Sequence, residues 1–257
     1  MDIELLKSGE ETAFILKGIN PAIANTIRRL VLDEVPVLAV EEVNLTKNNS
    51  ALYDETIAHR MGLIPLKTDL ETYNLPEKCK CKGEGCAKCR VNFKLKVVGP
   101  CNVLAENLEF DDPKVKPVYP KMVIVTLLKN QKLEVDGFAT LGNGKDHMKF
   151  SPAHIYYKGY PELIVSGKAN VKNCIDNCDG VLKDKGKTLE INDIMKFTDA
   201  HEDICEKNGV EVRASDENFI FFIESWGQLE LSEILDRAIT VFDEKLDELD
   251  EEMGKAK

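Results

Sequence analysis

The sequence predicts an α+β protein, and three observations support this class. Short β-rich segments recur between the N-terminus and residue 224, a helix has a clear start at Asn20, and a long amphipathic helix is expected at 229–249. Hydrophobic residues make up 43% and charged residues 31% of the 257 residues, which is typical of a soluble globular protein. No apolar run approaches the roughly 18 residues that a membrane-spanning helix needs.

The N-terminal part is expected to form a β-hairpin followed by a helix. Apolar residues alternate at Ile3 and Leu5, a turn is expected at Ser8-Gly9, and a second strand at 12–17. Asn20 is a good N-cap, and Pro21 suits the first helical position. Pro36 is expected to end this helix. One helical stripe consists of Ile23, Ile27, Leu30, Val31 and, as its one charged member, Glu34.

The middle of the chain is mostly β-rich. A short helix is expected at 54–61 and an irregular excursion at 111–120. Residues 161–212 are more polar and are expected to form a small α+β insert. Strands are expected at 37–45, 63–66, 93–98, 122–128 and 218–224.

The last predicted helix has one wide apolar face opposite a charged face. This stripe can pack on the chain's own sheet or on a partner chain, and the spacing alone leaves both alternatives open. Its members are Leu231, Ile234, Leu235, Ala238, Val241, Phe242 and Leu249.

The net charge of -11 argues against a protein whose main task is binding DNA, because counterion release by clustered Lys and Arg supplies most of that affinity. Magnesium-assisted phosphoryl transfer needs clustered aspartates beside a phosphate-binding surface, and neither a D-x-D-x-D run nor a Gly-rich phosphate loop occurs. The acidic, alternating start resembles neither a signal nor a transit peptide, so the cytoplasm is the expected compartment. The sequence therefore offers no signal of catalytic chemistry of this kind.

Four of the eight cysteines form a C-x-C-x4-C-x2-C pattern at Cys79, Cys81, Cys86 and Cys89. A loop this short can wrap one zinc ion in a closed tetrathiolate site. Its negative charge would be offset by the neighbouring cations, and Gly83 and Gly85 permit a tight turn. A reduced, metal-free loop or a disulfide pair is the alternative. The neighbouring cations are Lys78, Lys80, Lys82, Lys88 and Arg90.

Three stretches resemble the RNA polymerase alpha-type assembly family, and in particular its archaeal D type. The first is 20–30, with an N-x-x-R-R motif that ends at Arg29 and is followed by D-E-V-P and A-V-E. The second is 54–66, D-E-T-I-A-H-R-M-G-L-I-P-L, and the third is 224–229, E-S-W-G-Q-L. All three occur in the family's order and are spread over most of the chain.

The resemblance implies a split dimerisation domain, made of an antiparallel sheet plus helices, at 1–45 and 213–257. It implies a β-rich insert domain with the cysteine loop at 46–160, and a ferredoxin-like α+β domain at 161–212. Eukaryotic relatives have a similarly close first pair of cysteines in their zinc loop.

The resemblance also implies partners. The Leu231–Leu249 stripe would face a small L-type subunit, which shifts the expectation for this helix toward an interface. Arg28 and Arg29 would meet a large subunit, where guanidinium groups suit carboxylates, and His59 and Arg60 would belong to another large-subunit contact. DNA and RNA would be reached only through the complex, and no membrane is involved.

Cys174, Cys178 and Cys205 lie in the expected ferredoxin-like domain but depart from the ferredoxin C-x2-C-x2-C-x3-C-P pattern. The first two are separated by three residues and followed by Asp179 rather than proline, and the third is distant. The expectation is a domain without an iron–sulfur cluster. An iron–sulfur redox protein is nevertheless kept as the alternative function, and a zinc-loop nucleic-acid-binding module as a third.

Overall fold

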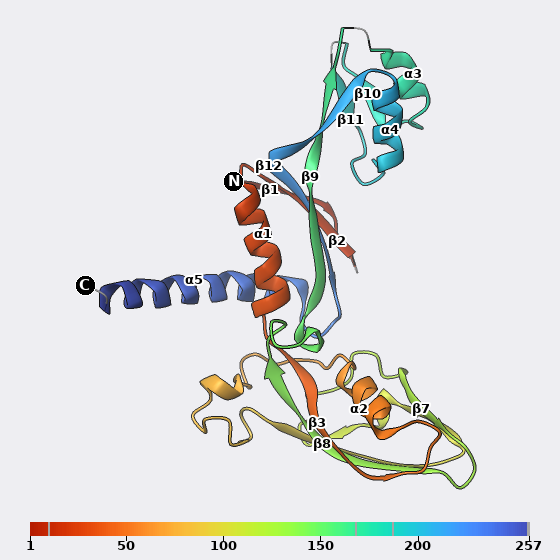
Figure 1. Cartoon of the computed structure of the whole chain (residues 1–257), viewed down its shortest axis with the longest axis vertical. Coiled ribbons are helices and arrows are strands. Elements are labelled where there is room, and N and C mark those ends of the chain that lie inside the picture. The colour runs from red at the N-terminus through yellow and green to blue at the C-terminus, as the bar shows by residue number, and fades with distance from the viewer. Residues whose placement is uncertain (10, 168, 187, 256–257) are drawn as a thin grey trace. The chain divides into compact units, whose positions relative to one another are not determined.

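The computed structural model of the protein describes residues 1–9, 11–167, 169–186 and 188–255. The chain divides into two compact units, and each is made from two separate segments. The first unit combines Met1–Asn25 with Tyr156–Ile223, and the second combines Thr26–Ile155 with Glu224–Lys257. Helices and antiparallel strands occur in both units, so the predicted α+β class is confirmed (Figure 1).

A four-stranded sheet in the order β1-β2-β12-β9 forms the body of the first unit. β1 and β2 form the predicted N-terminal hairpin, in which Ile3 pairs with Leu16 and Leu5 with Phe14. β2 is buried on both faces, and Phe14 stacks on Phe221 of β12 with the ring centroids 5.4 Å apart. The strands span Asp2–Lys7 (β1), Glu11–Lys17 (β2), Ala153–Val165 (β9) and Val210–Ser225 (β12).

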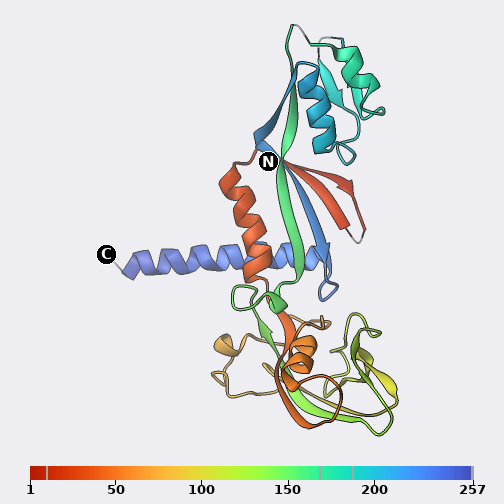
Figure 2. The ribbon, with the colours of Figure 1, turned by 45° about the vertical axis from the view of Figure 1, so that its right-hand side comes forward.

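A small α+β part continues from the ends of β9 and β12, as Figure 2 shows. It has its own hydrophobic core, which includes Phe197 and Val210. The described residues of 161–212 thus have the predicted mixed character, although residues 168 and 187 lie outside them, and the domain limits stay predictions. The elements are α3 (Val171–Asp176), β10 (Leu182–Asp184), β11 (Leu189–Ile191) and α4 (Asp199–Lys207).

Helix α1 (Pro21–Arg29) starts where the sequence predicts. The Asn20 side-chain oxygen accepts the backbone N–H of Ile23 at 2.9 Å, which satisfies one of the helix's unpaired donors. The helix continues into a π-helical turn, η1 (Leu30–Glu34), which ends before Pro36. The apolar stripe is buried only at its C-terminal end, because Leu30 and Val31 are buried whereas Ile23 is 45% exposed.

The second unit is built on a four-stranded sheet in the order β3-β8-β4-β6 and a two-stranded sheet of β5 and β7. Helix α2 (Asp54–Gly62) confirms the predicted short helix and buries Ile57 and Met61 in the core. Gly137 of β8 lies where a Cβ would collide with the Phe93 ring, so the close approach requires glycine. The strands are β3 (Val37–Asn48), β4 (Val91–Val98), β5 (Cys101–Leu104), β6 (Glu109–Phe110), β7 (Val123–Leu127) and β8 (Lys132–Gly142).

The strand expected at 63–66 is wrong. The N–H groups of Leu63 and Ile64 bond back to the last turn of α2, and Pro65 has no N–H to donate. Only Leu66 makes a β-bridge, to Pro117. Three short 3-10 turns complete this unit: η2 (Pro76–Lys78), η3 (Ala105–Asn107) and η4 (Met148–Phe150).

The C-terminal helix α5 (Leu231–Lys255) is longer than predicted. Its first half packs against η1 through the buried residues Ile234, Ala238 and Val241. Phe242 and Leu249, which the sequence placed on the same face, are 41% and 55% exposed. The predicted wide face is therefore two separate stripes, one packed within the unit and one exposed. Among the described residues, no helix combines the length and the apolar character that crossing a membrane requires.

Candidate metal centre and partner surfaces

The four cysteines of the loop at 79–89 come together in the second unit. Their sulfur atoms lie 3.4–3.8 Å apart in the four measured pairs, and all four lie within 4.8 Å of one another. Thiolates about 2.3 Å from one tetrahedral zinc ion would be about 3.8 Å apart. The donor set and its spacing thus fit a single tetrahedral ion, and these thiols could hold a metal.

Backbone turns place these sulfurs. The Cys89 and Arg90 N–H groups bond to the Cys86 carbonyl, both at 3.0 Å. Gly83 and Gly85 have φ of 86° and 94°, the left-handed region that glycine adopts without strain, as predicted. The backbone N–H of Cys86 lowers the pKa of the Cys81 thiol to about 5, so this ligand favours the thiolate form.

The loop is tied to helix α5 by an ion pair. Lys78 Nζ lies 3.3 Å from the Glu244 carboxylate, which also binds Arg237 at 2.9 Å. Lys80, Lys82 and Lys88 are exposed and have no ion-pair partner in the part of the chain that the structure describes.

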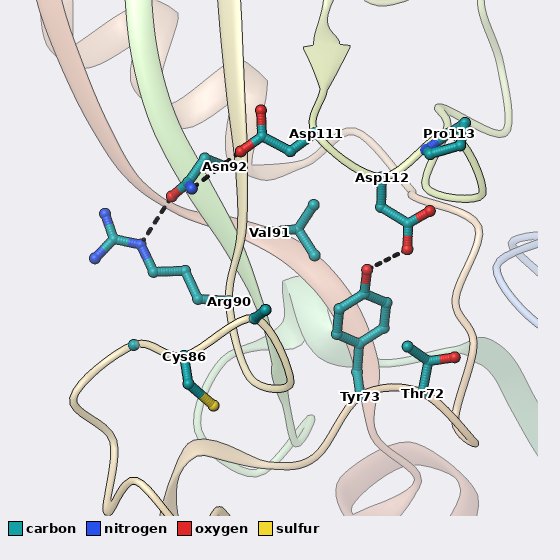
Figure 3. Close-up of a pocket in the computed structure, with 11 residues that line it drawn as sticks. Thr72, Tyr73, Cys86, Arg90, Val91, Asn92, Asp111, Asp112 and Pro113 are labelled. Carbon is teal, nitrogen blue, oxygen red and sulfur yellow. Dashed lines mark hydrogen bonds between the residues drawn. The ribbon is translucent and has the colours of Figure 1, made fainter.

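A pocket of about 620 Å³ opens beside the loop, and Cys86 lines it (Figure 3). The polar side chains in its walls are hydrogen-bonded to one another, and the Tyr73 hydroxyl donates to Asp112. Arg90 Nε donates to the Asn92 side-chain oxygen at 3.1 Å, and the Asn92 amide nitrogen donates to the Asp111 carboxylate at 3.1 Å. The Arg90 guanidinium also lies 3.6 Å from the centre of the Phe138 ring. In the sequence, Arg90 stood out only as a loop cation, and no pattern indicated the pocket. These interlocked side chains support the loop and form no nucleophile–base pair.

The second cysteine group forms a compact cluster in the first unit. Cys174 of α3, Cys178 and Cys205 of α4 are completely buried, and their sulfurs lie within 4.8 Å of one another. The Cys174 and Cys205 sulfurs are 3.1 Å apart. Cys205 is therefore not isolated, although its distance in sequence suggested that. Burial raises the pKa of Cys178 to about 11 and raises that of Cys205 further, so these thiols favour the neutral form.

The basic residues expected at large-subunit contacts have different surroundings. The Arg29 side chain is 65% exposed and lies 3.4 Å from Asp33 on the same helix face. Arg28 is half-buried, and His59 is exposed near the end of α2. The Arg60 guanidinium donates a hydrogen bond to the Ile124 carbonyl at 2.8 Å, and this bond stabilises the second unit.

The exposed stripe of α5 includes apolar residues outside the face that the sequence predicted. Ile239, Leu246 and Met253 join Phe242 and Leu249, and each of the five is at least 41% exposed. A heptad template applied to 239–253 could have found the added three, because the five positions are separated by steps of three and four.

Comparison with known proteins identifies relatives along the whole chain. Residues 43–155 match the family model described as the RNA polymerase Rpb3/RpoA insert domain. The chain is 34% identical to DNA-directed RNA polymerase subunit Rpo3 of Archaeoglobus fulgidus, with 96% of each chain covered. It is 36% identical to subunit Rpo3 of Methanosphaera stadtmanae, with 97% of each covered. It is 34% identical to that of Pyrococcus horikoshii, with 98% of each covered.

These matches give no support to the alternative of an iron–sulfur redox protein, and they agree with the family resemblance of the three sequence motifs. Their extent leaves no large part of the chain without a counterpart in the relatives. The chain therefore belongs to the Rpo3 family, the alpha-type assembly subunits of DNA-directed RNA polymerase.

Proposed function

We propose that this chain is the platform on which a small L-type subunit and the large polymerase subunits assemble. The complete polymerase is a nucleotidyltransferase, and this chain is one of its subunits. The observation that carries the proposal is the exposed apolar stripe of α5. A contiguous apolar surface in contact with water is unfavourable, and such surfaces mark interaction sites.

The two stripes of α5 support separate tasks. The inner stripe at Ile234, Ala238 and Val241 fixes the helix on η1. The outer stripe, from Ile239 to Met253, lies about a quarter turn away around the helix. A helix that is packed on one face and exposed on another can bind a partner helix without a change in its own structure.

The large subunits would dock at the two basic regions. Arg29 is exposed and Arg28 lies beside it, so a carboxylate of a partner could bind to their guanidinium groups. His59 is exposed for a second contact, whereas Arg60 is partly engaged by Ile124. An Arg29→Glu variant should keep the small partner but recruit the large subunits less well.

We further propose that the loop metal is zinc and that its role is structural. Four cysteines occupy all four corners of a tetrahedral site, which leaves no position for substrate. The chain's eight cysteines are all free, which agrees with a reducing cytoplasm. In the first unit, the buried thiols favour a ferredoxin-like domain at 161–212 without a cluster. The proposed limits of the other domains are 1–45 with 213–257 and 46–160, of which residues 10, 256 and 257 lie outside the described residues.

Co-expression with a small L-type subunit tests the proposal. A Phe242→Asp, Leu249→Asp double variant should abolish co-purification, because each carboxylate would be buried without a partner in an apolar interface. Ile164→Asp is the matched control, since Ile164 is 42% exposed and lies on β9 in the first unit, whereas α5 belongs to the second. A wild-type chain that stays separate from the L-type subunit would refute the pairing.

A further inference from the structure

The outer stripe of α5 has the spacing of a coiled-coil seam. Its members are separated by steps of three, four, three and four residues over roughly 21 Å of helix. Two such seams from different helices can interlock, so the apolar residues by themselves do not choose between a different subunit and a second copy of this chain. They are Ile239, Phe242, Leu246, Leu249 and Met253.

The residues that flank this seam are mainly acidic. Asp243 and Asp250 follow two seam residues directly, and Glu252 precedes a third. Residues 239–255 hold seven carboxylates and two lysines, a formal charge of -5. Five of these carboxylates have no ion-pair partner among the described residues, namely Asp243, Asp247, Glu248, Asp250 and Glu251.

Both lysines of this segment already have carboxylate partners. Lys245 lies 2.9 Å from Glu34 of η1, and Lys255 lies 2.7 Å from Glu252. A second copy of α5 would therefore bring a similar set of acids and no unpaired cation to the first. Like charges beside a coiled-coil seam weaken pairing, whereas opposite charges select the partner.

We propose that this acidic rim makes the α5 seam select a partner helix flanked by Lys or Arg and reject a second copy of this chain. This inference rests on the proposed pairing function and specifies the chemistry of the partner. The apolar seam supplies contact area, and the charge of the rim determines which helix binds to it. The rim should also speed association with the basic-flanked partner at low salt, where charge attraction acts over longer distances.

The test measures binding of three synthetic peptides to the full-length chain by fluorescence anisotropy. The first peptide is the native 231–255 sequence. The second carries Asp243→Lys, Asp250→Lys and Glu252→Lys. The third has the composition of the second with the order scrambled, so that the seam is lost. The second should bind at least about tenfold more tightly than either other peptide at about 50 mM salt, and its advantage over the first should shrink at about 1 M salt.

Two results would overturn the proposal. Equal binding of the first and second peptides at low salt would show that the rim does not discriminate. Equal binding of the second and scrambled peptides would show only general attraction to an acidic protein. The Phe242→Asp variant of the full chain tests whether the peptide binds at the α5 seam. It should bind the second peptide about tenfold more weakly, and undiminished binding would show that the peptide binds outside the seam.

The L-type subunit separates this inference from the proposed function. If the peptides discriminate but the L-type subunit does not bind, the pairing proposal fails and the selectivity of the rim stands. If the L-type subunit binds but the native and basic peptides bind alike, the rim has no selective role.

Discussion

The two cysteine clusters place the same donor atom in opposite surroundings. In the loop at 79–89, Cys81 and Cys86 are half-buried beside backbone N–H groups and exposed lysines, whereas Cys79 and Cys89 are buried. In the first unit, three sulfurs lie at zero exposure inside an apolar core that includes Phe197 and Val210. The sulfur atoms are close together in both clusters, whereas the charge that surrounds them differs.

The charge difference has a direct physical consequence. A tetrathiolate zinc site has a net charge of about -2, which nearby cations and N–H groups stabilise. The pKa of Cys81 falls to about 5, whereas burial raises that of its neighbour Cys89 to about 12, so the loop holds one thiol ready to ionise. In the core, burial and the neighbouring Cys174 thiol raise the pKa of Cys178 to about 11, with Asp179 adding to the rise. The loop is suited to a charged metal centre and the core to neutral thiols.

The largest expected effect is loss of the loop metal. A Cys89→Ala variant should lose one bound zinc ion per chain and at least about 3 kcal/mol of unfolding free energy in the second unit, because a structural metal contributes to folding. Metal analysis and thermal unfolding measure both. Cys101→Ala is the control, since Cys101 is exposed and outside both clusters. A chelated wild-type protein that unfolds like the untreated one would contradict the comparison.

The core cluster should respond as packing rather than as a ligand set. Cys205→Ser should cost about 2 kcal/mol, because it buries a hydroxyl in an apolar site, and Cys205→Ala about 1 kcal/mol. Neither should change the metal content of anaerobically purified protein, which should be colourless and free of iron. Iron bound by the wild type and lost in Cys205→Ser would overturn the assignment.

The raised pKa of Cys178 predicts a loss of stability at alkaline pH. The folded protein keeps a proton that the unfolded chain releases, so the contribution is complete below about pH 8.5, the ordinary thiol pKa. It declines as the pH rises toward the folded pKa of about 11. We expect a decline of about 1–2 kcal/mol over this range in denaturant titrations of the first unit. Cys178→Ala should reduce the slope without removing it, because burial also raises the pKa of Cys205. An unchanged slope would show that Cys178 does not contribute to it.

Local sequence signals predicted much of the fold. The Asn20 cap, the stop at Pro36 and the short helix predicted at 54–61 depend on near neighbours, and all three were found. β8 was missed because Gly137 and Gly142 interrupt its alternation, although close packing against Phe93 and Phe150 requires them. Such contacts between distant segments leave little trace in a local window.

The candidate sites were predictable to different degrees. The spacing of the loop cysteines identified four residues that could hold a metal, because a short loop brings its own ends together. The approach of Cys205 to Cys174 depends on how α3 and α4 pack, so the 30 residues between them concealed it. The pairing of Lys78 with Glu244 likewise joins distant segments, and no pattern in the sequence indicated it.

This last pair gives the smallest expected effect. Lys78 is 61% exposed and Glu244 37% exposed, so Lys78→Met should lower the unfolding free energy by only about 0.5 kcal/mol. Lys80→Met is the matched control, because this substitution removes the same charge beside the loop without breaking an ion pair. Both variants should keep the metal, and their difference in denaturant titrations should vanish at about 1 M salt. Equal losses in both variants would mean that the total positive charge around the thiolates matters and that the link to α5 does not.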